Sequence, residues 1–156
     1  MTTDLPHTRL RAPVDLDDLL NYKLSRLLAL SGTPVVRICE GRFGISRREW
    51  RLIASVAAHG PLSPSSLADH AHLDRARTSR AITSLVAKQL LVRSTRSGDR
   101  RRAEVALSAS GRALHDQLFP QVAVLNQAVV SVLDDATLDA FDAALDRLTA
   151  KAEQLS

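Results

Sequence analysis

The sequence predicts a mainly α-helical protein with one β-hairpin, an α+β fold class, on three observations. Leucine and alanine dominate its apolar residues, which favours helices over strands. Apolar residues recur three or four positions apart along much of the 156-residue chain, a spacing typical of amphipathic helices. Residues 91–112 form the exception, because they alternate as two short strands around an arginine-rich tip with a Ser97-Gly98-Asp99 turn.

The N-terminal part is predicted as an arm followed by a helix. Residues 1–13 are polar and lack periodicity, so we expect a flexible arm. A helix is expected from near Asp15 to about Glu40, kinked or interrupted at residues 31–34 by Ser-Gly-Thr-Pro. The apolar stripe of this helix consists of Leu16, Leu19, Leu20, Leu24, Leu27 and Leu28. Residues 14–44 are assigned as an N-terminal dimerisation helix.

Three short helices are predicted next. A capping box at Ser46 opens the first helix, which ends before Gly60. Ser63 and Asp74 are expected to cap the second and third helices, and the third extends over residues 75–90. Two helices around a tight turn, followed by a basic hairpin, match the plan of a winged helix-turn-helix.

Two longer helices are predicted over residues 109–156. Pro120 should bend the first, and Asp134 should cap the second. The second helix carries an apolar seam of Leu138, Phe141, Leu145, Leu148, Ala152 and Leu155. This seam fits another helix, either in a second subunit or within the same chain. We interpret these as C-terminal dimerisation helices, with intramolecular packing as the alternative.

Positive charge is concentrated in the predicted lobe, residues 45–108. Nine basic residues lie between Arg75 and Arg102, with Asp99 as the one acid among them. From Asp134 onward there are six acids and two bases, so the chain's net charge of +4 hides an uneven distribution. A strongly positive lobe concentrates polyanions. The lobe is therefore predicted to bind double-stranded DNA, and the alternative is a merely solvated arginine-rich face.

With these elements placed, the sequence resembles the MarR family of winged helix-turn-helix transcription regulators over residues 16–155. The resemblance rests on Asp99-Arg100-Arg101, the strand end Val105-Ala106-Leu107-Ser108, and Ser110-Gly111-Arg112. Ser108 stands where the family usually has threonine, which keeps a capping hydroxyl. The resemblance implies a homodimer that binds a pseudo-palindromic operator, usually as a repressor.

Candidate DNA-binding residues lie on the helix at residues 75–90 and on the hairpin. The exposed face of that helix should consist of Arg75, Arg77, Thr78, Ser79, Arg80 and Thr83. Ser63 and Ser65 would either bind a phosphate or simply cap a helix. The resemblance implies that Asp99 pairs with Arg101, which enters the minor groove, unless Asp99 is only a turn residue. Further phosphate contacts are expected from Arg93, Arg96, Arg100 and Arg102.

The resemblance also implies a small aromatic carboxylate or phenolic effector in a crevice between the dimerisation helices and the lobe. The candidate ligand-binding residues are Ser31, Arg37, Trp50, Arg51 and Arg80. Trp50 is either a ligand contact or a core residue. Arg80 serves either DNA alone or both DNA and the ligand.

Redox sensing through Cys39 is the alternative regulatory hypothesis, with Arg37 and Arg42 lowering the pKa of its thiol. The simpler alternative is a buried, unreactive thiol. The five histidines lack metal-ligand spacing, and no phosphate loop or nucleophile elbow is present, so we expect no catalysis, metal or cofactor. A single cysteine, the lack of a signal peptide and the lack of a long apolar run predict a soluble cytoplasmic protein.

Overall fold

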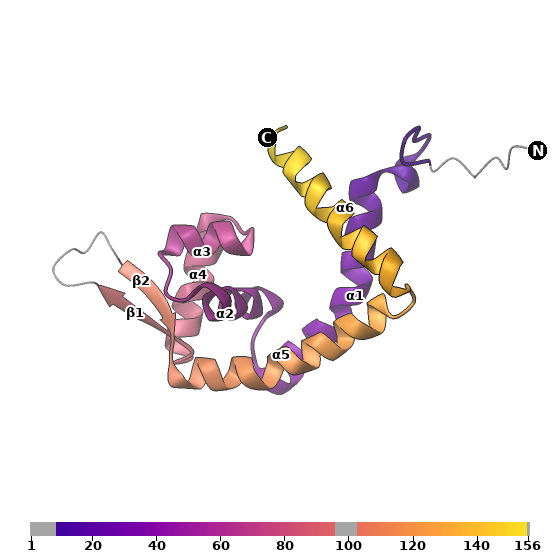
Figure 1. The fold of residues 1–156 in the computed structure, drawn as a ribbon. Helices are drawn as coiled ribbons and strands as arrows, with labels where there is room; N and C mark the ends of the chain where they lie inside the picture. The colour runs from indigo at the N-terminus through magenta and orange to yellow at the C-terminus, as the bar shows by residue number, and fades with distance from the viewer. Residues whose placement is uncertain (1–8, 96–102, 156) are drawn as a thin grey trace, which may run out of the picture. The chain divides into compact units, whose positions relative to one another are not determined.

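The computed structural model describes residues 9–95 and 103–155, which fall into two compact units, residues 1–119 and residues 120–156. The elements are η1 (Leu16–Asp18), α1 (Leu20–Phe43), α2 (Arg47–His59), α3 (Pro64–Ala71), α4 (Arg75–Ala87), β1 (Leu91–Thr95), β2 (Ala103–Leu107), α5 (Ala109–Val130) and α6 (Asp135–Glu153) (Figure 1). The predicted fold class, helices with one two-stranded wing, is confirmed. The boundary between the two units lies inside α5, so each unit is described by itself.

The three short helices begin where the sequence predicts. The capping box is present, because the Glu49 amide donates to Ser46 Oγ at 3.2 Å and the Ser46 amide donates to Glu49 Oε2 at 2.7 Å. Ser63 Oγ accepts from the Ser66 amide at 3.1 Å at the start of α3. Asp74 accepts from the Arg77 amide at 2.8 Å at the start of α4. These local bonds satisfy backbone donors that a helix start leaves free.

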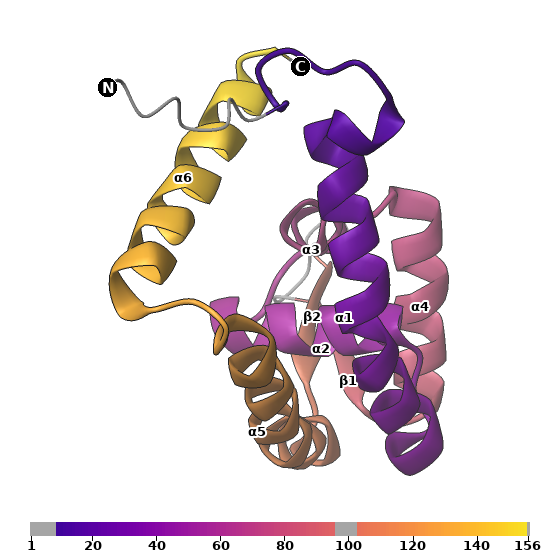
Figure 2. The ribbon, with the colours of Figure 1, turned by 90° about the vertical axis from the view of Figure 1, so that its right-hand side faces the viewer.

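The hairpin closes the core of the first unit. β1 and β2 pair antiparallel with Leu91 opposite Leu107. Leu62, in the loop before α3, exchanges backbone hydrogen bonds with Val105 of β2 at 2.8 and 3.1 Å. The core consists of fully buried side chains from α2 and the residue before it, α3, α4 and the two strands. They are Ile45, Leu52, Ile53, Leu67, Ile82, Leu85, Leu91 and Val105. Burial of each such side chain stabilises the fold by about 1.5–3 kcal/mol. Helix α2 lies at the centre of this unit and packs against α1, α3 and α4 (Figure 2).

A serine and a glycine join the hairpin to α5. Ser108 Oγ donates to the Gln89 carbonyl oxygen at 2.6 Å and accepts from the Gly111 amide at 2.9 Å. Gly111 is buried, and a Cβ there would collide with the Leu90 carbonyl oxygen. The start of α5 therefore lies so close to the turn after α4 that only glycine fits at position 111.

The first long helix differs from its predicted form. Asp15 caps the short η1 turn, Leu19 is extended, and α1 then continues from Leu20 to Phe43 rather than ending at Glu40. The helix is not interrupted, although Pro34 lies inside it. A proline removes one backbone donor, and the remaining hydrogen-bond ladder can continue on both sides of it.

The last helix of the lobe is shorter than predicted. α4 ends at Ala87 instead of extending to residue 90. Gln89 has a left-handed backbone with φ of 58°, and the Leu90 amide donates to the Leu85 carbonyl oxygen at 2.9 Å. This arrangement resembles the left-handed ends common in helices, and it turns the chain directly into β1.

The second unit contains the end of α5 and the whole of α6. α5 continues through Pro120. The predicted cap of α6 is confirmed, because Asp134 Oδ1 accepts from the Thr137 amide at 2.7 Å. No α6 residue is buried, and Phe141, Leu148 and Leu155 of its seam are exposed. Within the described parts of the chain, no helix combines the length and the apolar character needed to cross a bilayer.

Candidate nucleic-acid interface

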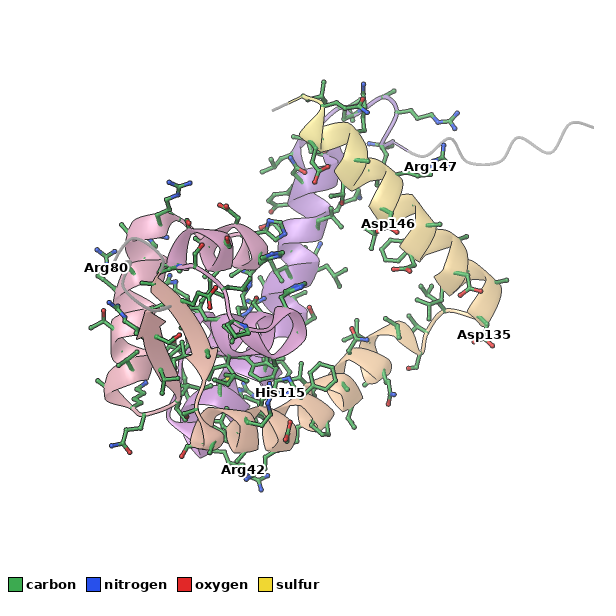
Figure 3. All side chains as sticks on the ribbon, turned by 60° about the vertical axis from the view of Figure 1, so that its left-hand side comes forward. Arg42, Arg80, His115, Asp135, Asp146 and Arg147 are labelled. Atoms are coloured by element: carbon green, nitrogen blue, oxygen red, sulfur yellow. The ribbon has the colours of Figure 1, made fainter. Side chains whose placement is uncertain are left out.

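The outer face of α4 presents most of the predicted DNA-binding residues. Arg75, Arg77, Ser79, Arg80 and Thr83 are exposed. Figure 3 shows the Arg80 side chain projecting from α4 away from the core of the lobe. Arg77 is held by Asp74, with Nε 3.3 Å from the carboxylate. The exposed face therefore combines guanidinium and hydroxyl groups, which are able to contact phosphates and base edges.

Thr78 does not belong to this face. Its residue is 1% exposed, and it shares the buried side of α4 with Ala81, Ile82 and Leu85. The expectation that Thr78 lies on the exposed face is therefore wrong. Its Oγ1 is buried and has no hydrogen-bond partner among the described residues. A buried hydroxyl without a partner reduces stability.

One contact joins the wing strand to α4. Arg93 Nη2 on β1 donates to Thr83 Oγ1 at 3.2 Å, and Thr83 Oγ1 donates to the Ser79 carbonyl oxygen at 3.1 Å. Two predicted DNA-binding residues from different elements thus meet at the surface. Arg96, Asp99, Arg100, Arg101 and Arg102 lie outside the described residues, so their roles stay predictions.

The serines at the start of α3 are engaged with one another. Ser63 Oγ, besides capping the helix, donates to Ser66 Oγ at 2.8 Å and lies 3.1 Å from Ser65 Oγ. The capping role of Ser63 is confirmed. Phosphate binding by Ser63 and Ser65 stays a prediction.

A depression between α2 and α4 contains residues that the sequence analysis did not single out. It has a volume of about 310 Å³, and its lining includes Arg48, Glu49, Arg77, Arg80, Ser84 and Lys88. The sequence held one signal for Arg48. Two arginines occupy the first turn of α2, where the helix dipole favours acidic residues, and such an unfavourable placement suggests another role for the charge. One of the pair, Arg47, packs against α1, because a Cβ at Gly32 would lie 2.7 Å from its Nη1.

Glu49 fastens the start of α2 to the end of α4. Its Oε1 accepts from Ser84 Oγ at 2.7 Å and from Lys88 Nζ at 3.0 Å. Its Oε2 accepts from the Ser46 amide at 2.7 Å and from Lys88 Nζ at 3.0 Å, and Lys88 also donates to the Gly44 carbonyl oxygen. Burial alone would raise the pKa of Glu49, but these hydrogen bonds and the Lys88 charge together lower it. The carboxylate is therefore held ionised beside α4.

The depression between α2 and α4 contains only one of the candidate ligand-binding residues. Trp50 is 6% exposed and stacks on His115 with ring centroids 5.7 Å apart, so it is a core residue of the first unit. Ser31 Oγ donates to the Leu27 carbonyl oxygen at 2.8 Å, whereas Arg37 and Arg51 are exposed. The depression described above includes Arg80 and none of the other four candidates.

Cys39 is fully buried at the end of α1. Burial and the negative charge of Glu40 raise the pKa of its thiol, and the opposing positive charge is Arg47. The expectation of a lowered thiol pKa beside Arg37 and Arg42 is therefore wrong, because this pKa is raised. A buried thiol with a raised pKa reacts poorly with oxidants. No group of three potential metal ligands occurs in the part of the chain that the structure describes.

Comparison with known proteins agrees with this geometry. Residues 43–102 match the model of the MarR family. A MarR/EmrR family transcriptional regulator from Acinetobacter sp. ADP1 has a TM-score of 0.83 at 21% identity, covering 90% of this chain and 99% of that one. NadR in complex with 4-hydroxyphenylacetate has a TM-score of 0.72 at 26% identity, covering 83% and 92%. BpsR from Bordetella bronchiseptica, whose DNA binding is regulated by 6-hydroxynicotinic acid, has a TM-score of 0.67 at 22% identity, covering 81% and 98%.

No curated protein matches the chain. The family match covers α2, α3, α4 and β1, and it includes the exposed arginines of α4. Residues 43–102 therefore match the MarR family, and the chain has the fold of MarR-family transcriptional regulators.

Proposed function

We propose that this protein is a homodimeric repressor that binds a pseudo-palindromic operator and is released from it by a small aromatic acid. The observation that carries the proposal is the exposed face of α4, which the Arg93–Thr83 hydrogen bond joins to the wing strand at 3.2 Å. α4 is the recognition helix, and residues 45–108 are the DNA-binding lobe.

DNA binding is supported by the chemistry of this face. Arg75 and Arg80 are exposed, and within the described ranges no carboxylate lies within 4.0 Å of either guanidinium group. Arginine can form paired hydrogen bonds with guanine or with a phosphate, and serine and threonine can donate to or accept from base edges. Ser63, Ser65 and the five wing-tip residues Arg96, Asp99, Arg100, Arg101 and Arg102 complete the proposed contact set.

Dimerisation is supported by apolar surface on the helices outside the lobe. On α1, Leu27, Leu28 and Leu30 are exposed, and on α6, Phe141 and Leu148 are exposed. Apolar surface of this extent commonly marks a protein–protein contact. We assign residues 14–44 and 109–156 to the contact with a second copy. A twofold dimer then presents two recognition helices to half-sites about 34 Å apart.

An aromatic acid effector is supported by the ligands of two related structures. NadR is complexed with 4-hydroxyphenylacetate, and 6-hydroxynicotinic acid regulates the DNA binding of BpsR. In this chain Ser31, Arg37, Arg51 and Arg80 are the proposed contacts, and Trp50 is left out because it is buried in the core of the first unit. A ligand releases DNA only if it favours the form that cannot bind the operator, or if it occupies Arg80 directly.

The test is selection of bound duplexes from a random DNA pool, repeated with hydroxyphenylacetates, benzoates and hydroxynicotinates present. We expect an enriched inverted repeat, a dimer by sedimentation equilibrium, and loss of the enriched duplex with at least one acid. An enriched sequence without twofold symmetry would contradict the dimer. Retention of the duplex with every acid would contradict the effector class.

A further inference from the structure

The depression between α2 and α4 holds four cationic side chains and a single carboxylate. Arg48 and Glu49 line it from α2, and Arg77, Arg80 and Lys88 line it from α4. The two helices are fixed against each other at this point by the Glu49 hydrogen bonds to Ser84 and Lys88. This network therefore fixes the helix positions from which the surrounding guanidinium groups extend.

Two of the four cations already have a negative partner. Lys88 Nζ lies 3.0 Å from Glu49 Oε2, and Arg77 Nε lies 3.3 Å from Asp74 Oδ2. Arg48 and Arg80 are exposed, and nowhere in residues 9–95 or 103–155 does a carboxylate oxygen come within 4.0 Å of their guanidinium nitrogens. The depression thus has two uncompensated guanidinium groups, one from each helix.

We propose that Arg48 and Arg80 together hold one phosphate of the DNA backbone at the edge of the groove that α4 enters. A helix in the major groove, which is about 12 Å wide, has sugar-phosphate backbone on either side. Guanidinium groups match phosphate oxygens in charge and in hydrogen-bond geometry. This inference rests on the proposed DNA-binding function, and it adds to the DNA contacts a residue of α2, which precedes the helix-turn-helix and the wing.

The shape of the site favours a phosphate of a polymer over a free small anion. The depression is open to solvent, whereas sites for small ligands usually bury most of the ligand surface. A backbone phosphate needs no enclosure, because the rest of the duplex is held by α4 and the wing. The Glu49 carboxylate does not oppose binding strongly, because Lys88 neutralises it and four hydrogen bonds occupy its oxygens.

The experiment measures duplex affinity by fluorescence anisotropy between about 50 and 200 mM salt, for the full chain and three variants. Loss of one phosphate contact lowers the slope of log affinity against log salt by about 0.9 per subunit. Arg48→Gln leaves Arg80 on the same phosphate, so we expect weaker binding and a slope that is lowered by part of this amount. The wild-type advantage should then shrink with rising salt, by at most about threefold per subunit across this range. Base preference should not change, because a phosphate contact carries no sequence information.

Two matched variants separate charge from other effects. Arg48→Lys keeps a cation at the site and should retain the wild-type slope. Arg112→Gln removes one exposed arginine from the start of α5, away from the depression, and should also retain it. A circular dichroism melt of Arg48→Gln that matches the wild type confirms that the variant folds.

Three outcomes would overturn the inference while leaving the proposed function intact. These are an unchanged slope in Arg48→Gln, a lost preference at one base pair, or tight calorimetric binding of inorganic phosphate to the DNA-free protein that Arg48→Gln abolishes. The last result would identify a small-anion site instead. If the wild-type protein binds no duplex at all, the proposed function fails, and the inference fails with it.

Discussion

Arg93 of β1 and Thr83 of α4 are joined by a hydrogen bond of 3.2 Å from Nη2 to Oγ1. Both side chains are exposed, so this bond contributes little to folding. Its effect is to hold a guanidinium group of β1 beside α4. Thr83 is oriented for this by its own bond to the Ser79 carbonyl oxygen at 3.1 Å.

The first prediction concerns the coupling of these two residues in DNA binding. Thr83→Val removes the acceptor but keeps the branched shape, and Arg93→Gln removes the charged donor. Each variant should weaken duplex binding, and the double variant should lose less than the sum, with a coupling of about 0.5–1.5 kcal/mol. A double-mutant cycle on duplex affinity measures this. The control cycle of Arg75→Gln with Thr83→Val should be additive, and additivity in the Arg93 cycle would refute the coupling.

The second prediction concerns the glycine at the start of α5. A Cβ at Gly111 would collide with the Leu90 carbonyl oxygen, which belongs to the backbone and cannot move aside cheaply. Gly111→Ala should therefore lower the free energy of unfolding by about 1–3 kcal/mol, measured by urea denaturation.

Gly41 provides the matched control for this substitution. It lies in α1, and no atom comes within 4 Å of a Cβ built there. Gly41→Ala should raise the free energy of unfolding by up to about 1 kcal/mol, because alanine favours helix more than glycine. Equal effects of the two substitutions would show that the close approach at residue 111 is not rigid.

The helix starts were predictable from sequence because they depend on local chemistry. Ser46, Ser63, Asp74 and Asp134 each accept a hydrogen bond from an amide three residues ahead. The end of α4 was not predictable in this way. It depends on a left-handed Gln89, a conformation for which a glutamine gives no local signal.

The proposed DNA-binding face was only partly predictable. Thr78 is predicted on the exposed face of this helix, although its spacing to Ala81, Ile82 and Leu85 is that of a buried helix side. The charge of Arg48 in the first turn of α2 is a sequence signal, but only the packing of α2 on α4 shows that Arg48 and Arg80 line one depression. The effector candidates come from three different helices, and no sequence pattern specifies how side chains from separate helices converge.

The third prediction concerns acid stability. Hydrogen bonds from Ser46, Ser84 and Lys88 hold the pKa of Glu49 below its ordinary value of 4.5 in the folded protein, despite the burial that would raise it. A lowered folded pKa means that the stabilisation is present above about pH 4.5 and is lost as the pH falls through the folded pKa. Urea unfolding at several pH values between 7 and 3 should show this loss.

Glu49→Gln should remove this part of the pH dependence. At neutral pH the variant should also lose about 1–3 kcal/mol, because the charge-assisted bonds to Lys88 are gone. Glu40→Gln, which removes an exposed carboxylate from α1, serves as the control. It should lose unfolding free energy at acid pH in the same way as the wild type. The role assigned to Glu49 is wrong if its variant and the wild type lose stability in parallel below pH 4.5.

The fourth prediction separates the inner and outer faces of α4. Thr78 is buried, and its Oγ1 has no partner among the described residues, so Thr78→Val replaces an unsatisfied hydroxyl with a methyl group of similar size. The free energy of unfolding should rise by about 1 kcal/mol, and duplex affinity should stay within about twofold of the wild type. Ser79→Ala on the exposed face should do the reverse, with weaker duplex binding and little change in stability. If Thr78→Val instead weakens duplex binding about tenfold without a gain in stability, the hydroxyl contacts DNA, and the orientation of α4 described above is wrong.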